Sequence, residues 1–324
     1  MKVLVTGATG FLGGWTARAL KARGDTVRVL GRNATALAGL EAEGMEPVQS
    51  DLRNARQVFD ACRGMDAVVH AGAMCAPWGR LIDFHDVNVG GTSIVLSGCR
   101  EHGVGRMIHI SSPSVVFNGG DQEGIREDAP YPRRFASSYA ETKKLAEDVV
   151  NAGIAIGFPA VILRPRLLFG PGDGTLVPRL IAAARAGRLK RIGDGTNRTD
   201  PTYVENAVHA ILLALDADRA LGRTYTITNG KSVHLWALVG MVLEHAGLTE
   251  KLPSIPLSLA LRLARALEWQ AWFTRREPVL TRYSVQMLAR TQTYDISRAS
   301  EELGYSPVVS LDEGIRRTVE AWKQ

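Results

Sequence analysis

The sequence predicts an α/β protein with a doubly wound parallel sheet and a smaller, mostly helical second domain. Short apolar segments alternate with helical patterns through the first half of the chain. Several of these segments are apolar at consecutive positions, as expected for parallel strands buried on both faces. After Pro165 this alternation ends and helical patterns dominate, which indicates a second domain.

The elements of the first half follow one another as strand and helix. The first expected helix, 11–23, places Leu12, Trp15, Ala19 and Leu20 on one face, which is the spacing of an amphipathic helix. The strands expected in the sheet lie at 3–6, 26–30, 46–49, 67–70, 107–111 and 160–163.

The second half contains mainly helices and glycine-rich loops. Loops are expected at 170–174 and 193–197, where glycine and proline are frequent. A strand end leads into a helix over 203–216, and a short strand is expected at 224–228. Further helices are expected at 176–186, 235–246, 257–273, 280–289 and 311–322. We therefore assign residues 1–165, with returning segments at about 196–230, to the larger domain, and 166–195 and 231–324 to the smaller one.

The composition is that of an ordinary folded protein and says little about its function. The chain has 324 residues, 45% of them hydrophobic, and a formal net charge of +6. The arginines are scattered and form no basic run, so we expect no nucleic-acid partner. An anionic cofactor, an acidic substrate or a solvated surface would each account for the positive charge.

The cysteines and the N-terminus suggest a cytoplasmic protein. Cys62, Cys75 and Cys99 show no metal-ligand spacing, so we expect free thiols and no metal site. A strand is expected to begin almost at residue 1, which leaves no room for a signal peptide. No apolar run reaches the ~18 residues of a membrane span.

A glycine-rich loop joins the first strand to the first helix. Gly7, Gly10 and Gly13 follow the spacing G-x-x-G-x-x-G. Glycine at these positions permits a tight turn, close approach of a pyrophosphate and close packing of helix on sheet. The alternative is a glycine-rich turn in an unrelated α/β protein. The strand and helix on either side favour a dinucleotide-binding Rossmann domain over residues 1–165.

The end of the second strand indicates which dinucleotide is preferred. An acidic residue there would bind the ribose hydroxyl of NAD, whereas this chain has Arg32 after Gly31. A guanidinium suits the additional phosphate of NADP. NADP(H) is therefore favoured and NAD(H) stays possible, since Arg32 could also be a solvated loop residue.

A tyrosine and a lysine share one helical turn in the middle of the chain. Ser138-x-x-Glu141 is a capping box, so a helix is expected to begin near Ser138. Tyr139 and Lys143 are four residues apart and lie on the same face of that helix. A lysine ammonium and a cationic nicotinamide would lower the phenol's pKa from its usual ~10, so that Tyr139 could exchange a proton with a carbonyl or alcohol oxygen. The alternative is a solvated surface pair.

A serine at the end of a neighbouring strand supports the catalytic interpretation. The strand 107–111 leads into Ser112 at the carboxyl edge of the sheet, where ligands bind in this fold. The hydroxyl of Ser112 could bind the reacting oxygen. His70 and His109 lie on core strands, so we interpret them as buried histidines and not as metal ligands.

The chain resembles the extended short-chain dehydrogenases/reductases from Met1 to about Trp322. The resemblance is carried by Thr6-Gly7-x-x-Gly10-x-x-Gly13, Asp51-Leu52, His70-Ala71-Gly72-Ala73, Asn88-Val89-x-Gly91-Thr92, Ser112, Tyr139-x-x-x-Lys143 and Arg164-Pro165. It implies an oxidoreductase in which Ser112, Tyr139 and Lys143 are catalytic and Asn88 positions Lys143 through water.

The resemblance also implies a cofactor cleft and a homodimer. The dimer would form through helices near 88–102 and 139–152. The residues that would contact the cofactor are Gly7, Thr9, Gly10, Phe11, Leu12, Gly13, Arg32, Asp51, Leu52, Ala71, Gly72, Ala73, Tyr139, Lys143, Pro165, Leu167 and Leu168.

Within that family, the chain is most similar to the 3β-hydroxysteroid dehydrogenase/isomerase branch. Residues 164–173, 200–204 and 280–284 carry this similarity. Leu167 stands where sugar-nucleotide epimerases and dehydratases place an asparagine. The similarity implies a small apolar ketone or alcohol as substrate, namely a bulky 3-oxo or 3-hydroxy compound such as a 2-alkyl-3-oxo acid or a sterol-like molecule. We expect Trp78, Ser114, Arg166 and Tyr203 to contact it, with Arg166 as a partner for a substrate carboxylate.

Two other functions stay open at this point. An NAD-dependent sugar-nucleotide epimerase or dehydratase would share the glycine loop and the Tyr139–Lys143 pair. A non-catalytic dinucleotide sensor would need no Ser112, Tyr139 and Lys143 set, so their presence argues against it.

The segment 257–273 is unusually apolar for a helix of a second domain. It contains six leucines or alanines in its first half and Trp269, Trp272 and Phe273 near its end, interrupted by Arg262, Arg265 and Glu268. It could line a hydrophobic tunnel, touch a membrane surface or form an ordinary core helix.

Overall fold

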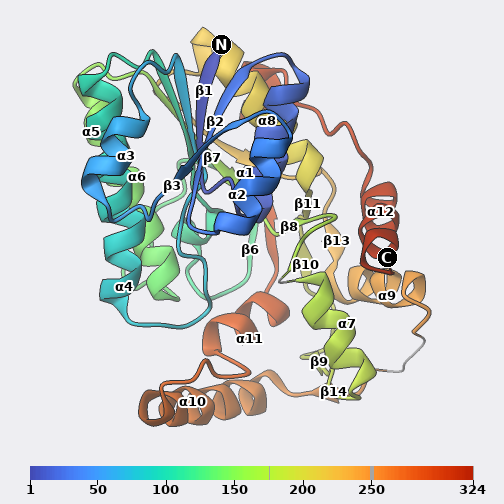
Figure 1. The fold of residues 1–324 in the computed structure, drawn as a ribbon. Coiled ribbons are helices and arrows are strands. Elements are labelled where there is room, and N and C mark those ends of the chain that lie inside the picture. Colours follow the sequence, from blue (N-terminus) through green and yellow to red (C-terminus); the bar gives the residue numbers. More distant parts are fainter. Residues whose placement is uncertain (175, 249–251, 324) are drawn as a thin grey trace.

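The computed structural model describes residues 1–174, 176–248 and 252–323. Residues 175, 249–251 and 324, which belong to the expected second domain, lie outside the described residues. The central feature is a seven-stranded, wholly parallel sheet with the order β12-β7-β5-β4-β1-β2-β3 (Figure 1). Its strands are β1 (Lys2–Thr6), β2 (Thr26–Gly31), β3 (Glu46–Gln49), β4 (Ala67–His70), β5 (Arg106–Ile110), β7 (Ala160–Pro165) and β12 (Thr224–Ile227).

Consecutive apolar residues in these strands pack into two different cores. Val3 and Val5 of β1 lie in one hydrophobic cluster and Leu4 lies in the other, because successive side chains of a strand point to opposite faces. All three are fully buried. The sheet is therefore covered on both faces, as its continuous apolar strands predicted.

Helices form the two outer layers of this sandwich (Figure 1). One face is covered by α1 (Phe11–Ala22), α2 (Ala34–Ala42) and α8 (Val204–Asp216). The other is covered by α3 (Ala55–Ala61), α5 (Gly91–Glu101) and α6 (Ser138–Ala155), with the short α4 (Leu81–His85) beside them. The strand order reverses between β1 and β4, which is the position at which this fold binds ligands.

The remaining helices gather below the carboxyl edge of the sheet (Figure 1). They are α7 (Val177–Arg185), α9 (Leu235–His245), α10 (Leu257–Thr274), α11 (Arg282–Ala289) and α12 (Leu311–Lys323). A separate cluster around Trp236, Val239, Leu243 and Val285 forms the core of this part.

Several small strands in the lower part were not expected from the sequence. A four-stranded sheet joins β13 (Val233–His234), β10 (Arg198–Thr199), β15 (Gln292–Tyr294) and β6 (Gln122–Ile125). Two strand pairs complete the set, β8 (Leu168–Phe169) with β11 (Thr202–Tyr203) and β9 (Arg191–Ile192) with β14 (Ser254–Ile255). Most of these strands have only two or three residues, too few to show a pattern, and the four-residue β6 has no apolar run because its sequence is Gln-Glu-Gly-Ile.

The start of α6 differs by one residue from the predicted capping box. Ser137, and not Ser138, is the N-cap, and its hydroxyl accepts a hydrogen bond from the amide of Ala140 at 3.2 Å. Ser138 is the first helical residue. The predicted capping residue is therefore wrong, because either of the two adjacent serines could satisfy the free amides of the first turn. The predicted helix itself is present.

Candidate active site

The glycine loop packs against the end of β4 with no room for side chains. Gly7 has a φ of +69°, and a Cβ there would lie 2.5 Å from the Cα of Gly72. A Cβ on Gly13 would lie 2.3 Å from the carbonyl oxygen of Gly7. Gly10 is the N-cap of α1, and among the described residues no side chain caps this helix. The free amides of its first turn therefore fit a pyrophosphate group.

Leu52, one of the residues expected to contact the cofactor, packs against two glycines. This side chain is buried and lies close to Gly72 and Gly91, where an added Cβ would come within 2.9 and 3.0 Å of it. Asp51 precedes it and accepts two hydrogen bonds from the guanidinium of Arg53. These bonds lower the pKa of Asp51 to about 2, so the carboxylate stays ionised.

Two guanidinium groups surround this one carboxylate. Arg32 follows β2, is 74% exposed, and lies 3.7 Å from the Asp51 carboxylate. Arg53 lies 2.8 Å from the same carboxylate and is 57% exposed. This corner of the cleft therefore carries more positive than negative charge. Sequence analysis identified Arg32 but missed Arg53, because nothing in the sequence shows that the loops after β2 and β3 meet here.

Lys143 is held deep in the site by the neighbouring strand. Its side chain is buried, and its ammonium donates a hydrogen bond of 2.6 Å to the carbonyl oxygen of Ile110, the last residue of β5. Burial lowers the pKa of Lys143 to about 8, while the negative charge of Glu147 opposes this shift. The same helix face thus carries Tyr139, Lys143 and Glu147 at successive four-residue steps.

The phenol of Tyr139 lies next to Ser112 and the thiol of Cys75. Burial raises the pKa of Tyr139 well above its ordinary value, and Cys75 and Tyr283 raise it further. The hydrogen bond from Ser112 acts in the opposite direction. The expected lowering by Lys143 is therefore outweighed in the protein itself, because desolvation disfavours the phenolate. Tyr139 is a protonated phenol and hence a proton donor.

Ser112 reaches this phenol from the turn that follows β5. It is the N-cap of a short 3-10 helix, η2 (Pro113–Val116), and its hydroxyl accepts a bond of 3.3 Å from the amide of Ser114. Ser112 is partly exposed, whereas Ser111 is buried. The structure thus brings Ser112, from the turn after β5, together with Tyr139 and Lys143 of the helix α6 that covers the sheet.

Asn88 links the loop 71–80 to helix α6 through hydrogen bonds of its side chain. It lies in a π-helical turn, η1 (Asp86–Gly90), and is buried. Its side chain accepts a bond of 2.7 Å from the amide of Met74, donates one of 3.1 Å to the same residue's carbonyl, and donates one of 3.0 Å to Thr142. The water link to Lys143 stays a prediction. The bonds that are present hold the loop at Met74, and the next residue, Cys75, hydrogen-bonds Tyr139.

Two side chains at the site escaped sequence analysis. Cys75 is exposed in the loop 71–80, and its thiol hydrogen-bonds the phenol of Tyr139. Tyr283 comes from the first turn of α11, more than a hundred residues after Tyr139. Burial raises the pKa of Tyr283 to about 12, and Arg166 and Ser114 act against this rise. Tyr283 lies in the segment 280–284 that carries the family similarity, but only the fold shows that it and Cys75 lie beside Tyr139.

Arg166 directly follows β7, at the carboxyl edge of the sheet. Its guanidinium is close enough to Tyr283, Tyr294 and Asp200 to shift the pKa of each. Leu167, the next residue, has a φ of 45°. A positive φ is unusual for leucine and indicates local strain, which is frequent beside functional sites. Leu168 follows in β8.

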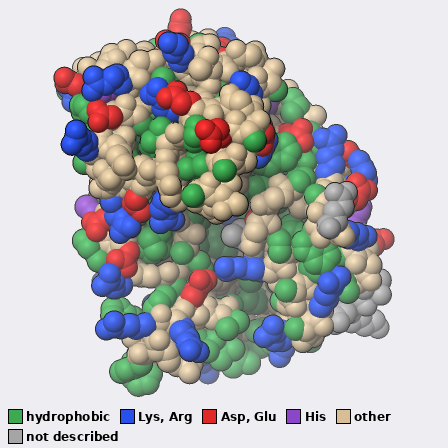
Figure 2. Space-filling model, in the orientation of Figure 1, with side chains coloured by type: hydrophobic (Ala, Val, Ile, Leu, Met, Phe, Trp, Pro, Cys, Tyr) green, Lys and Arg blue, Asp and Glu red, His purple; other side chains and the backbone are tan. Residues whose placement is uncertain are grey.

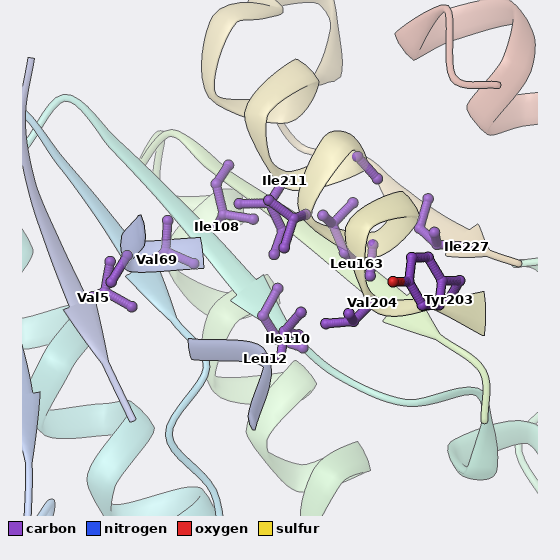
Figure 3. Packing of buried hydrophobic residues seen from close by; sticks show 14 of the residues in the cluster. Val5, Leu12, Val69, Ile108, Ile110, Leu163, Tyr203, Val204, Ile211 and Ile227 are labelled. Carbon is purple, nitrogen blue, oxygen red and sulfur yellow. The ribbon is translucent and has the colours of Figure 1, made fainter. Parts of the chain in front are cut away.

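Tyr203 lies in the hydrophobic core and not beside Tyr139 and Arg166. Its side chain is fully buried and packs against Phe169 with ring centroids 5.5 Å apart. Figure 3 shows its ring among core residues such as Leu163, Val204 and Ile227. Its hydroxyl bonds Glu205 at 3.2 Å. The expectation of substrate contact is corrected here: β11 leads directly into α8, which turns this side chain into the core.

The two histidines of the core strands are structural. His70 bonds the hydroxyls of Thr6 at 2.7 Å and Thr92 at 3.0 Å. Burial lowers the pKa of His70 to about 3 and that of His109 well below its ordinary value, so both rings are neutral. Within the described residues, no three His, Cys, Asp or Glu side chains gather as metal ligands.

Comparison with known proteins assigns this geometry to a family. The model of the 3-beta hydroxysteroid dehydrogenase/isomerase family matches residues 4–259. The chain belongs to this family. It is therefore an NAD(P)-dependent extended short-chain dehydrogenase/reductase that acts on CH–OH groups, with 3-oxo or 3-hydroxy substrates.

Individual relatives cover nearly the whole chain. A 2-alkyl-3-oxoalkanoate reductase of Stenotrophomonas maltophilia is 39% identical, and the aligned part covers 98% of each protein. A sterol-4-alpha-carboxylate 3-dehydrogenase of Schizosaccharomyces pombe is 34% identical over 99% of this chain and 96% of its own length. Among solved structures, the dTDP-glucose 4,6-dehydratase DesIV of Streptomyces venezuelae has a TM-score of 0.80 at 26% identity, covering 100% of this chain and 97% of its own.

Proposed function

We propose that the enzyme interconverts a 3-oxo acid bearing an apolar 2-alkyl chain with the corresponding 3-hydroxy acid, using NADP(H). The position of Arg166 carries this proposal. Tyr283 is the shared neighbour of Arg166 and of the catalytic Tyr139. A substrate that places its ketone at Tyr139 and its carboxylate at Arg166 would use both groups. The similarity to 2-alkyl-3-oxoalkanoate reductases supports the same substrate class.

The residues of the site divide the chemistry of ketone reduction among them. Tyr139 donates its proton to the carbonyl oxygen, and Ser112 donates a hydrogen bond to that oxygen as negative charge develops on it. Lys143, fixed by Ile110, would hold the ribose hydroxyls of the dinucleotide. Gly7, Gly10 and Gly13 would cradle its pyrophosphate. When bound, the dinucleotide supplies or accepts the hydride.

The proposal is tested by a substrate panel with both reduced cofactors. We expect NADPH oxidation with a 2-alkyl-3-oxo acid, less with a 3-ketosteroid, and none with a UDP-sugar. Turnover of the UDP-sugar without net change of the cofactor would instead indicate the epimerase. The sensor alternative has no support, since the family consists of enzymes.

Replacement of Arg32 by alanine should reduce the preference for NADPH. A charge-assisted hydrogen bond to phosphate contributes about 1.5–3 kcal/mol, so kcat/KM for NADPH should fall by roughly 10- to 100-fold. The value for NADH should change little. Arg18→Ala removes an exposed arginine on the far side of α1 that is paired with Glu43, and it serves as the control. Equal losses with NADPH and NADH would show that Arg32 does not recognise the phosphate.

Replacement of Arg166 by alanine should raise the KM for an acidic substrate. Loss of a partner for the carboxylate should raise the KM by about tenfold or more, with a smaller effect on kcat. The methyl ester of the same substrate provides the control, because it lacks the charge and should show the same KM with both enzymes. Steady-state kinetics with an unchanged KM for the acid would remove Arg166 from the site.

A further inference from the structure

Helix α10 buries three alanines and partly buries Leu257 and Leu261, while its largest apolar side chains are exposed. The side chains it buries fully are those of Ala260, Ala264 and Ala271. The largest apolar side chains are exposed on the opposite side of the helix. Their exposed fractions are 53% for Leu259, 49% for Leu263, 69% for Trp269, 72% for Trp272 and 71% for Phe273. One side of α10 thus packs on the hydrophobic core, as a core helix would, and the other side leaves large apolar side chains exposed, which an ordinary core helix does not do.

The aromatic residues form one group at the end of this helix. Trp269 and Phe273 lie one turn apart with ring centroids 5.0 Å from each other. Trp272 lies beside them in the sequence and is equally exposed. Tryptophan and phenylalanine are the residues that amphipathic helices insert at the boundary of a lipid bilayer. We name Leu259, Leu263, Trp269, Trp272 and Phe273 the α10 patch.

Among the described residues, the arginines around the α10 patch have no acidic partners. Arg262, Arg265, Arg275 and Arg276 are all exposed. Within the part of the chain that the structure describes, none of them forms an ion pair, whereas the nearby Glu268 and Glu277 are each paired with another arginine. Figure 2 shows blue side chains beside green ones at the lower edge of the molecule, where Figure 1 places α10. The surface is thus apolar and cationic, which fits anionic lipid headgroups.

Helix α11 links the α10 patch to the active site. Glu268 of α10 accepts hydrogen bonds of 2.7 Å from the backbone and the guanidinium of Arg282. Arg282 opens α11, and the next residue is Tyr283, which lies beside Tyr139 in the site. Figure 1 shows α11 between α10 and the sheet. A membrane held at α10 would therefore lie one helix away from the catalytic residues.

We propose that the α10 patch docks on the surface of an anionic lipid bilayer, from which an apolar substrate reaches the site past α11. The docking on lipid does not depend on the proposed function; only the delivery of a substrate rests on that function.

A second copy of the chain fits the α10 patch less well than a lipid surface does. A symmetric pairing would bring the same four arginines face to face, and like charges would repel. Among the described residues no helix is long and apolar enough to cross a bilayer, so the contact is with the surface.

Vesicle co-sedimentation tests this proposal without substrate or cofactor. We expect the protein to pellet with vesicles of phosphatidylcholine and phosphatidylglycerol, and to pellet less with phosphatidylcholine alone or at high salt. The Trp269→Ser/Trp272→Ser/Phe273→Ser variant should lose roughly tenfold or more of its partitioning. Arg262→Gln/Arg265→Gln should lose the preference for the anionic vesicles. The matched control is Ile82→Ser/Ile156→Ser, which removes two exposed apolar side chains elsewhere and should bind as the wild type does.

Two results would overturn the proposal. One is wild-type protein that stays in the supernatant with anionic vesicles. The other is a triple variant that binds vesicles normally but changes from dimer to monomer in light scattering, which would make the patch a contact between copies. The thermal unfolding midpoint of each variant verifies that it is folded. Because binding is measured without turnover, a failed reductase assay leaves this test unaffected.

Discussion

Replacement of Tyr139 by phenylalanine should lower kcat/KM for ketone reduction by about 10²–10⁴-fold. Burial raises the pKa of the Tyr139 phenol well above its ordinary value, and the phenol hydrogen-bonds Ser112, so it can donate a proton to an oxygen bound there. Phenylalanine preserves the shape of the ring and removes the proton. Steady-state kinetics would measure the loss, while fluorescence titration with NADPH should show nearly unchanged cofactor binding.

A second tyrosine provides the control for this variant. Tyr225 of β12 is buried and donates a hydrogen bond of 2.8 Å to Glu302, away from the site. Tyr225→Phe should therefore change stability slightly and kcat/KM hardly at all. If Tyr139→Phe were as active as Tyr225→Phe, the assignment of Tyr139 as the proton donor would be wrong.

The largest effect on stability should come from breaking the buried ion pair of Arg164 and Glu147. Arg164 of β7 is 3% exposed and Glu147 of α6 is 0% exposed. Two hydrogen bonds of 2.8 and 2.7 Å join them, and the hydroxyl of Tyr131 bonds the same carboxylate at 3.0 Å. Removing either partner leaves an uncompensated buried charge, which costs about 3–5 kcal/mol. Arg164→Met and Glu147→Leu should each lower the free energy of unfolding by this amount.

Combining the two replacements should restore much of the lost stability. A buried ion pair replaced by apolar residues of similar volume is often close to neutral, so the double variant should be more stable than either single one. Denaturant unfolding measures all three. The exposed pair of Arg18 and Glu43 is the control, since breaking it should cost less than about 1 kcal/mol. If the single variants lost no more free energy of unfolding than this control, the buried ion pair would not have the predicted role in stability.

The carboxylate of Glu147 should also influence the pH dependence of the reaction, because it raises the pKa of Lys143. Lys143 has a pKa lowered to about 8 by burial, so its ammonium is present below that pH and is lost as the pH rises through it. Glu147 opposes this lowering. Glu147→Gln should therefore shift the alkaline loss of kcat/KM toward lower pH. A shift toward higher pH would exclude the electrostatic role of Glu147.

The features that the sequence predicted well are those that depend on neighbouring residues. The glycine loop, the strand that leads into Ser112 and the Tyr139–Lys143 turn are each complete within a few residues of chain. Each strand expected in the parallel sheet is present, because continuous apolar segments report burial on both faces.

The features that the sequence did not reveal depend on distant segments that meet only in the fold. Arg53 joins Arg32 because β2 and β3 are neighbours, and Tyr283 joins Tyr139 because α11 lies under the carboxyl edge of the sheet. Tyr203 was misplaced for the opposite reason. It belongs to the segment 200–204 that carries the family similarity, but its strand turns its side chain into the core.

Hydride transfer to a 2-alkyl-3-oxo acid tests the central claim most directly. The wild-type enzyme would be incubated with NADPH carrying deuterium at the transferable position of the nicotinamide, and the product examined by mass spectrometry. We predict a 3-hydroxy acid with one deuterium on the carbinol carbon, formed by the wild type and lost in Tyr139→Phe. A product without deuterium, or no product while a UDP-sugar is epimerised, would contradict the account.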